Sequence, residues 1–125
     1  MNNKPQFKAV VQAMLADALA GYVSTERLVD YLTQHGWQRQ KRKDEREMVF
    51  SAPITADDGS AIHLVMYQVE AGNWLGKAMQ TSTALSLVAA IEERSKLAVL
   101  LDWLDPQHAE AVRQLLVALE QSEVD

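Results

Sequence analysis

Three histidines are the side chains best suited to proton transfer near neutral pH in this chain of 125 residues. His35, His63 and His108 fall in three different predicted elements, without the His-x-x-x-His spacing of a metal-binding helix. His63 lies within the alternating run 61–67 and is the best single candidate for acid–base work. A nuclease or hydrolase centred on His63 is therefore one hypothesis. His35, near a predicted helix end, is explained by a favourable interaction with the helix dipole.

Other patterns of catalytic or metal-binding residues are missing from the sequence. The chain has no cysteine, which excludes disulfides, thiolate metal sites and thiol nucleophiles. It also has no Gly-x-Ser-x-Gly nucleophile elbow and no glycine-rich phosphate loop. Asp57 and Asp58 carry ligands suited to a hard cation, but Gly59 beside them favours a tight turn. The sequence therefore predicts no catalytic residues beyond the His63 hypothesis, no metal and no cofactor.

A dense cationic segment follows the second predicted helix. It is notable because the whole chain is acidic, with 17 acidic and 12 basic residues and a net charge of −5. That balance argues against a general polyanion binder, since phosphate neutralisation requires a positive field. Three interpretations remain: a strand edge kept soluble by charge, a site for RNA or DNA, or a site for an acidic protein partner. The basic segment consists of Arg39, Lys41, Arg42, Lys43 and Arg46.

Two apolar stripes near the end of the chain suggest an interaction surface. They hold more Leu and Val than a domain with a small sheet requires, and they either pack on each other or bind a partner. The leading hypothesis is a non-enzymatic interaction protein, acting as a homodimer or as a subunit docked on a larger protein. RNA or DNA binding comes second and hydrolysis third. The predicted helical interaction face consists of Leu97, Leu101, Trp103, Leu104, Val112, Leu116 and Leu119.

Hydrophobic periodicity predicts the elements that position these residues. A helix is expected over 7–20, and a second helix begins after Ser24 as N-cap and ends at Gly36. Period-two alternation then predicts strands on either side of the turn at 57–59. The fold class is α+β, with a small three-stranded antiparallel sheet covered by N-terminal and C-terminal helices in one domain, 1–125. The helix-covered face of the sheet is predicted to hold Met48, Phe50, Ile62, Leu64 and Met66.

The final third of the chain is predicted to be helical. Apolar residues recur with helical spacing over 79–91, and Ser95 is suited to begin another helix. Asp105 followed by Pro106 is the strongest boundary in the sequence, an N-cap followed by proline at the first helical position. We expect a last helix from this point and expect it to belong to the core.

Targeting signals are not evident. The first residues lack the charged start and apolar core of a secretory signal, and no apolar run approaches the roughly 18 residues of a membrane span. We therefore expect a cytoplasmic protein that does not enter a membrane.

Residues 24–91 resemble a known module. Their predicted order of helix, three strands and helix is similar to the double-stranded-RNA-binding-like fold, and in particular to HicA-type messenger-RNA-cleaving toxins. The shared features are a helix that ends in a Gly-Trp pair, here Gly36-Trp37, and a short basic strand that leads into a second strand. The resemblance implies that fold but not the reaction, because residues 44–47 occupy the place of the family's catalytic histidine. The same framework also looks like small uncharacterised bacterial proteins.

Overall fold

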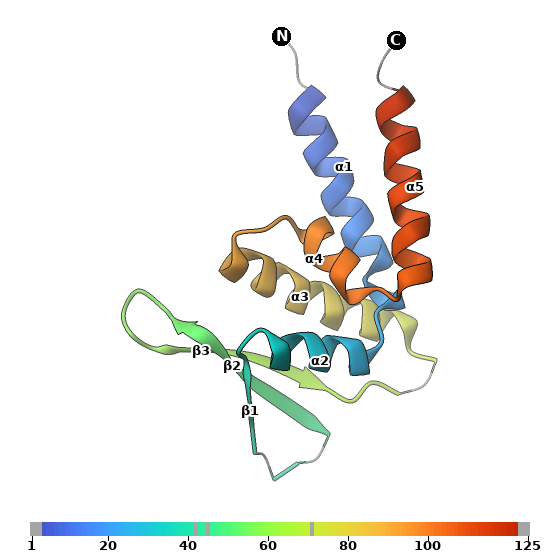
Figure 1. Cartoon of the computed structure of the whole chain (residues 1–125). Helices are drawn as coiled ribbons and strands as arrows, with labels where there is room; N and C mark the ends of the chain where they lie inside the picture. The colour runs from blue at the N-terminus through green and yellow to red at the C-terminus, as the bar shows by residue number, and fades with distance from the viewer. Residues whose placement is uncertain (1–3, 42, 45, 71, 123–125) are drawn as a thin grey trace.

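The computed structural model describes residues 4–41, 43–44, 46–70 and 72–122, so Arg42 of the basic segment lies outside the described residues. It confirms the α+β fold, with five α-helices and a three-stranded antiparallel sheet packed against helices. Figure 1 shows the sheet at one end of the molecule and the chain termini at the other. The elements are α1 (Lys4–Leu19), the 3-10 turn η1 (Ala20–Tyr22), α2 (Thr25–Gln34), β1 (Gln38–Gln40), β2 (Glu47–Thr55), β3 (Ala61–Tyr67), α3 (Trp74–Glu92), α4 (Lys96–Trp103) and α5 (Pro106–Ser122).

Local signals set both ends of α2, as predicted. The Ser24 hydroxyl oxygen accepts a hydrogen bond from the Arg27 backbone N–H at 3.2 Å, which satisfies one of the free amides of the first turn. At the other end Gly36 adopts a φ of 89°, a conformation that glycine takes without a steric penalty. The Trp37 amide then donates back to the Leu32 carbonyl at 2.9 Å. This turn carries the Trp37 side chain into the core.

The sheet has the order β1-β2-β3, and its register confirms the predicted buried face. Met48 lies opposite Met66 and Phe50 lies opposite Leu64, so these four side chains point to the same side. Phe50, Leu64 and Met66 are buried in the core cluster, and Met48 packs against it. Ile62 is half-buried. The helices thus cover one face of the sheet, because that face carries the apolar positions of β2 and β3.

The helical boundary at Asp105 is also confirmed. Pro106 is the first residue of α5, and the Asp105 Oδ1 atom accepts a hydrogen bond from the His108 amide at 3.0 Å. Ala109 and Val112 of α5 are buried in the core, and Leu116 packs against it. Among the described helices, none combines the length and apolar character needed to cross a membrane.

We call the pair of helices α1 and α5 the arm. The two helices run antiparallel and side by side, and they extend away from the sheet (Figure 1). Near the far end of the arm, the Lys8 Nζ and Glu120 Oε1 atoms form an ion pair at 3.2 Å. At the near end, Asp17 of α1 pairs with Lys96 of α4 at 2.7 Å. The arm is therefore fixed to the body at one end and exposes much of its surface at the other.

Candidate functional site

The structure places most of the predicted helical interaction face inside the core. Leu97, Trp103, Leu104 and Val112 are buried within this single chain. Leu101 and Leu116 are partly buried and pack against the same cluster. Of the seven predicted residues, Leu119 alone is classed as exposed, with 39% of its surface accessible. The two stripes therefore pack largely on each other and on the rest of the body, and Leu119, on the arm, is the most exposed of the seven residues.

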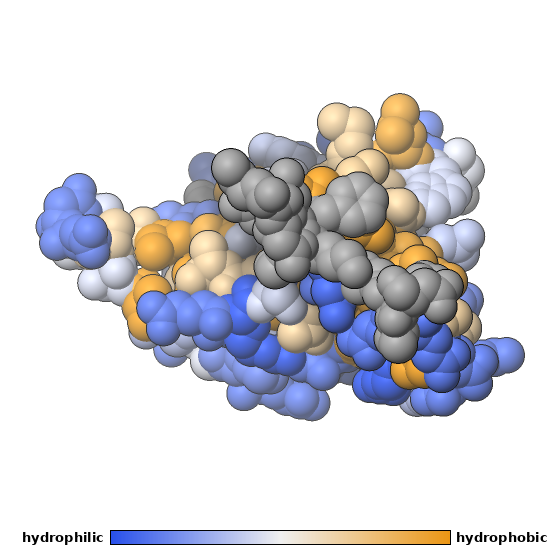
Figure 2. Space-filling view, turned by 90° about the horizontal axis from the view of Figure 1, so that it is seen from above, coloured by the Kyte–Doolittle hydropathy of each residue, from blue (hydrophilic) through white to orange (hydrophobic). Residues whose placement is uncertain are grey.

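The arm carries large apolar side chains that are exposed in the part of the chain that the structure describes. On α1, Val10 and Met14 are 54% and 65% exposed and lie one helical turn apart. On α5, Leu115 and Leu119 have the same spacing and are 46% and 39% exposed. Figure 2, viewed from above, shows hydrophobic side chains reaching the surface on this side of the molecule. Exposed large apolar groups grouped in this way mark interaction surfaces more often than scattered ones do.

A groove runs between the two helices of the arm. Its volume is about 340 Å³, and we call it the arm groove. The charged groups on the arm are largely paired with one another, Lys8 with Glu120 and Arg113 with Glu110. His108 is the one lining residue with a basic side chain, and it contacts Asp105 and the ring of Tyr22. The groove is lined by Leu15, Leu19, Tyr22, Leu104, His108, Ala111, Val112 and Leu115.

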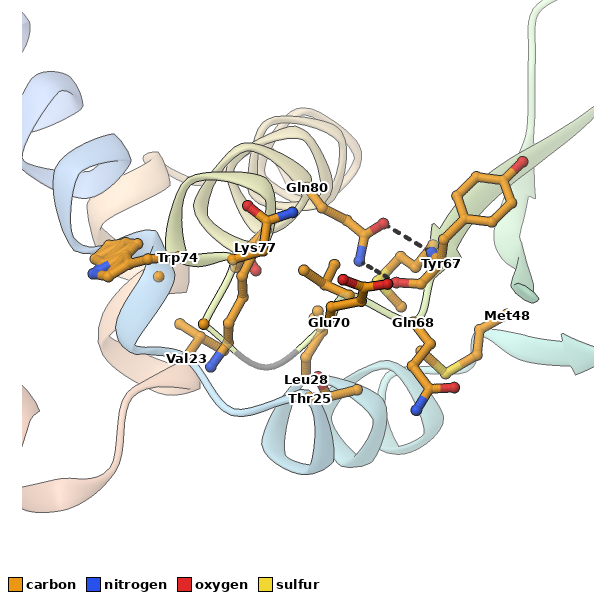
Figure 3. A pocket seen from close by; sticks show the side chains of 16 residues that line it. Val23, Thr25, Leu28, Met48, Tyr67, Gln68, Glu70, Trp74, Lys77 and Gln80 are labelled. Atoms are coloured by element: carbon orange, nitrogen blue, oxygen red, sulfur yellow. Dashed lines mark hydrogen bonds between the residues drawn. The ribbon is translucent and has the colours of Figure 1, made fainter. Parts of the chain in front are cut away.

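A larger cleft of about 750 Å³ opens between the start of α2, the end of β3 and the first turns of α3 (Figure 3). Leu28, Met48 and Met66 give it an apolar floor, while Glu70 and Lys77 bring charges to its rim. Among the described lining residues there is no histidine, and the side chains able to exchange protons are Glu70, Lys77 and Tyr67.

The described residues of the basic segment lie on β1 and in the connection between β1 and β2. Arg39 lies on β1, and Lys41 and Lys43 lie in the connection; all three are exposed. Arg46 pairs with Asp44, whose Oδ1 atom is 3.4 Å from the Arg46 Nε atom. The backbone N–H of Arg46 also donates to this carboxylate and lowers the pKa of Asp44 below its ordinary value. The hairpin thus offers several solvated cations but neutralises one of them itself.

His63, the candidate acid–base residue, lies on the face of the sheet that the helices leave open. It is exposed and sits opposite Ser51 of β2. Within the described parts of the chain, it has no carboxylate partner, and no cluster of His, Asp and Glu side chains is suited to a metal ion. Asp58 accepts hydrogen bonds from the amide and hydroxyl of Ser60, as its predicted turn role requires. The part of the chain that the structure describes therefore brings no charged catalytic partner to His63.

A polar cluster that sequence reasoning missed joins α2 to the end of α3 and to α4. The Tyr31 hydroxyl donates to Glu92 at 2.7 Å, and its ring stacks on His35 with centroids 3.8 Å apart. Arg94 bridges Glu92 at 3.1 Å and Asp102 at 2.8 Å. Burial and the Glu92 carboxylate raise the pKa of Tyr31 above its ordinary value. The sequence shows only that Tyr31 and His35 are one helical turn apart. Glu92, Arg94 and Asp102 reach them because α2 packs beside the end of α3 and α4.

No family model, no curated protein and no solved structure matches this chain. The resemblance of residues 24–91 to the HicA-type module stays a prediction.

Proposed function

We propose that the protein is a non-enzymatic interaction protein that docks on a larger protein partner, and that the partner inserts an amphipathic helix into the arm groove. The observation that carries this proposal is the apolar groove between α1 and α5, in which the lining residue Leu115 is 46% exposed. The absence of a catalytic grouping around His63 among the described residues makes hydrolysis the weaker hypothesis.

A helix is the occupant that the groove fits best. Two antiparallel helices present ridges and a groove between them, and the side chains of a third helix fill such a groove. Recognition then depends on apolar residues at i, i+3, i+4 and i+7 of the incoming helix. The ion pairs Lys8–Glu120 and Arg113–Glu110 leave few unpaired charges on the arm for a charged partner. The partner's contact stripe is therefore apolar.

The shape of the groove favours a different protein over a second copy. A two-fold symmetric dimer brings the same patch of each copy together. Two concave grooves facing each other would enclose empty space, whereas protein interfaces and interiors are closely packed. A convex helix from another protein avoids this void.

Site-specific photo-crosslinking in extracts of the source cells tests the proposal. A photoreactive residue at Leu115, in the groove, should give one discrete adduct with another protein, and the linked peptide should belong to an amphipathic helix. The same residue at Ser60, in the exposed β2–β3 turn, is the matched control and should not give this adduct. The Leu15→Asp change should abolish the adduct, while Lys8→Gln should retain it. Adducts between two copies from position 115, or the same adduct from both positions, would overturn the proposal.

Nucleic-acid binding through the basic segment is the second candidate function. The observation in its favour is that Lys41 and Lys43 are exposed and form no ion pair with the described residues. If phosphates are the ligand, affinity must fall steeply between low and physiological salt. Reversing both charges, Lys41→Glu with Lys43→Glu, should then abolish binding to RNA or DNA. An equal loss on reversing Lys8, on the distant arm, would point to nonspecific electrostatics instead.

A further inference from the structure

We infer that β3 pairs with the β3 of a second copy, so that two sheets join edge to edge in an antiparallel dimer. This inference uses a surface remote from the arm groove and goes beyond the proposed docking function. It starts from the hydrogen-bonding groups that β3 directs away from its neighbour β2.

The direction of these groups follows from the pairing of β2 and β3. In an antiparallel pair, alternate residues direct their N–H and C=O groups to the neighbouring strand, and the others point away. Tyr67 points away, because its N–H and C=O bond to the side chain of Gln80 at 2.8 and 2.9 Å (Figure 3). Residues two positions apart in a strand direct their backbone groups to the same side. The N–H and C=O groups of His63 and Val65 therefore also point away from β2. Among the described residues, their outward backbone groups have no hydrogen-bond partner.

The composition of β3 leaves this edge unprotected. Proteins commonly block a free edge with prolines, charged side chains, very short strands or bulges. The opposite edge follows this rule, since β1 has three residues and carries Arg39. By contrast, β3 has seven residues, Ala61–Tyr67, with no proline, lysine, arginine, aspartate or glutamate. The pairing of β2 with β3 has one irregularity, and it lies between Ser51 and Thr55 of β2. The edge is thus open to pairing along most of its length.

Gln80 determines which register a second copy can adopt. Because Gln80 occupies the groups of Tyr67, the free positions are Ala61, His63 and Val65. An antiparallel pairing that places His63 opposite its own copy also places Ala61 opposite Val65. This register uses every free position and leaves both Gln80 bonds intact. A shift that set Ala61 opposite Tyr67 would break them.

The side chains agree with this register. Ile62 of one copy would lie opposite Leu64 of the other, on the face that the helices cover. Ile62 is only half-buried in the single chain, so the pairing extends the apolar face across the new junction. An edge strand is self-complementary because each position carries both a donor and an acceptor. This property, which the concave arm groove lacks, favours a second copy as the occupant.

Charge at the symmetry axis gives a sharp test. We expect the full-length protein to show twice the chain mass in sedimentation or light scattering, in a concentration-dependent manner. His63→Lys places like charges directly opposite each other and should weaken the dimer by about tenfold or more. Gln38→Lys is the matched control, because Gln38, Ser51 and His63 form one row across the sheet and Gln38 lies on the other edge. Mixing His63→Lys with His63→Glu should restore a dimer.

Cysteine cross-linking provides a second measurement on a chain that has no cysteine of its own. Opposed hydrogen-bonded residues have Cα atoms about 5.5 Å apart, within the range of about 4.4–6.8 Å for disulfides. His63→Cys should therefore form a covalent dimer on mild oxidation, and Gln38→Cys should not. A monomer at all concentrations, or a dimer equally stable with His63→Lys and Gln38→Lys, would overturn the inference. Neither result would affect the groove proposal, since no arm residue is changed.

Discussion

The ring of Trp74 lies so close to the Cα atom of Gly21 that a methyl group added there would stand 1.8 Å from Cζ3 of the indole. This relationship joins η1 to the first residue of α3, next to the large cleft. Glycine is required at position 21 because the Trp74 ring leaves no room for a side chain. Backbone conformation is not the reason, since the glycines with positive φ are Gly36, Gly59 and Gly72.

The Gly21→Ala change should displace the Trp74 ring. The ring is 45% exposed and can swing outward, so the cost stays near the lower end for overpacking, about 1 kcal/mol of unfolding free energy. The ring would also lose its edge-on contact with Tyr22, whose centroid is 5.6 Å away. Urea unfolding and tryptophan fluorescence measure both effects. In a Trp74→Ala background the same change should cost little; an undiminished cost would show that the ring is not the obstacle.

Tyr31 should make the protein less stable at alkaline pH. Burial and the Glu92 carboxylate raise the pKa of Tyr31 in the folded state, so the folded chain holds this proton more tightly than the unfolded chain does. The unfolded state then loses the proton first, near the ordinary tyrosine value of about 10, and stability falls as the pH rises above it. Urea unfolding between pH 9 and pH 11, roughly one unit on either side of that value, measures the slope.

Tyr31→Phe removes the titrating hydroxyl and should flatten this alkaline slope. It should also lower stability at neutral pH by about 1 kcal/mol, because Glu92 and Arg94 each lose a hydrogen-bonding partner. Tyr67→Phe, at a tyrosine that is 55% exposed and lies outside this cluster, is the matched variant against which the slope of Tyr31→Phe is compared. Equal slopes in the wild-type chain and Tyr31→Phe would contradict the assignment.

Trp103 and Leu119 should respond differently to truncation, although the sequence assigns both to one apolar face. Trp103 is fully buried, and replacing it with alanine should cost about 3–5 kcal/mol through lost contacts and a cavity. Leu119 is 39% exposed on the arm, and its replacement should cost less than about 1 kcal/mol. Chemical denaturation of the two variants checks this. Similar losses would mean that the arm is as tightly packed as the body.

Most of the element boundaries were predictable because they depend on neighbouring residues. Ser24, Gly36 and Asp105 act through hydrogen bonds or backbone conformations within a few positions of themselves. The face shared by Phe50, Leu64 and Met66 was predictable for the same reason, since alternation along a strand fixes which side chains point together. The sequence also located the exposed basic hairpin, which follows from the chain's own polarity.

The tertiary structure alone decided which apolar side chains are covered. Periodicity shows that residues share a face of a helix, but it does not show what packs against that face. Thus Trp103 and Leu104 are in the core, while Leu115 lines an open groove and Leu119 is exposed. The cluster around Tyr31 and the capping of Tyr67 by Gln80 likewise join residues that are distant in sequence. Those contacts depend on how helices and strands pack together. The hydrophobic periodicity of one helix or strand does not show which other element packs against it.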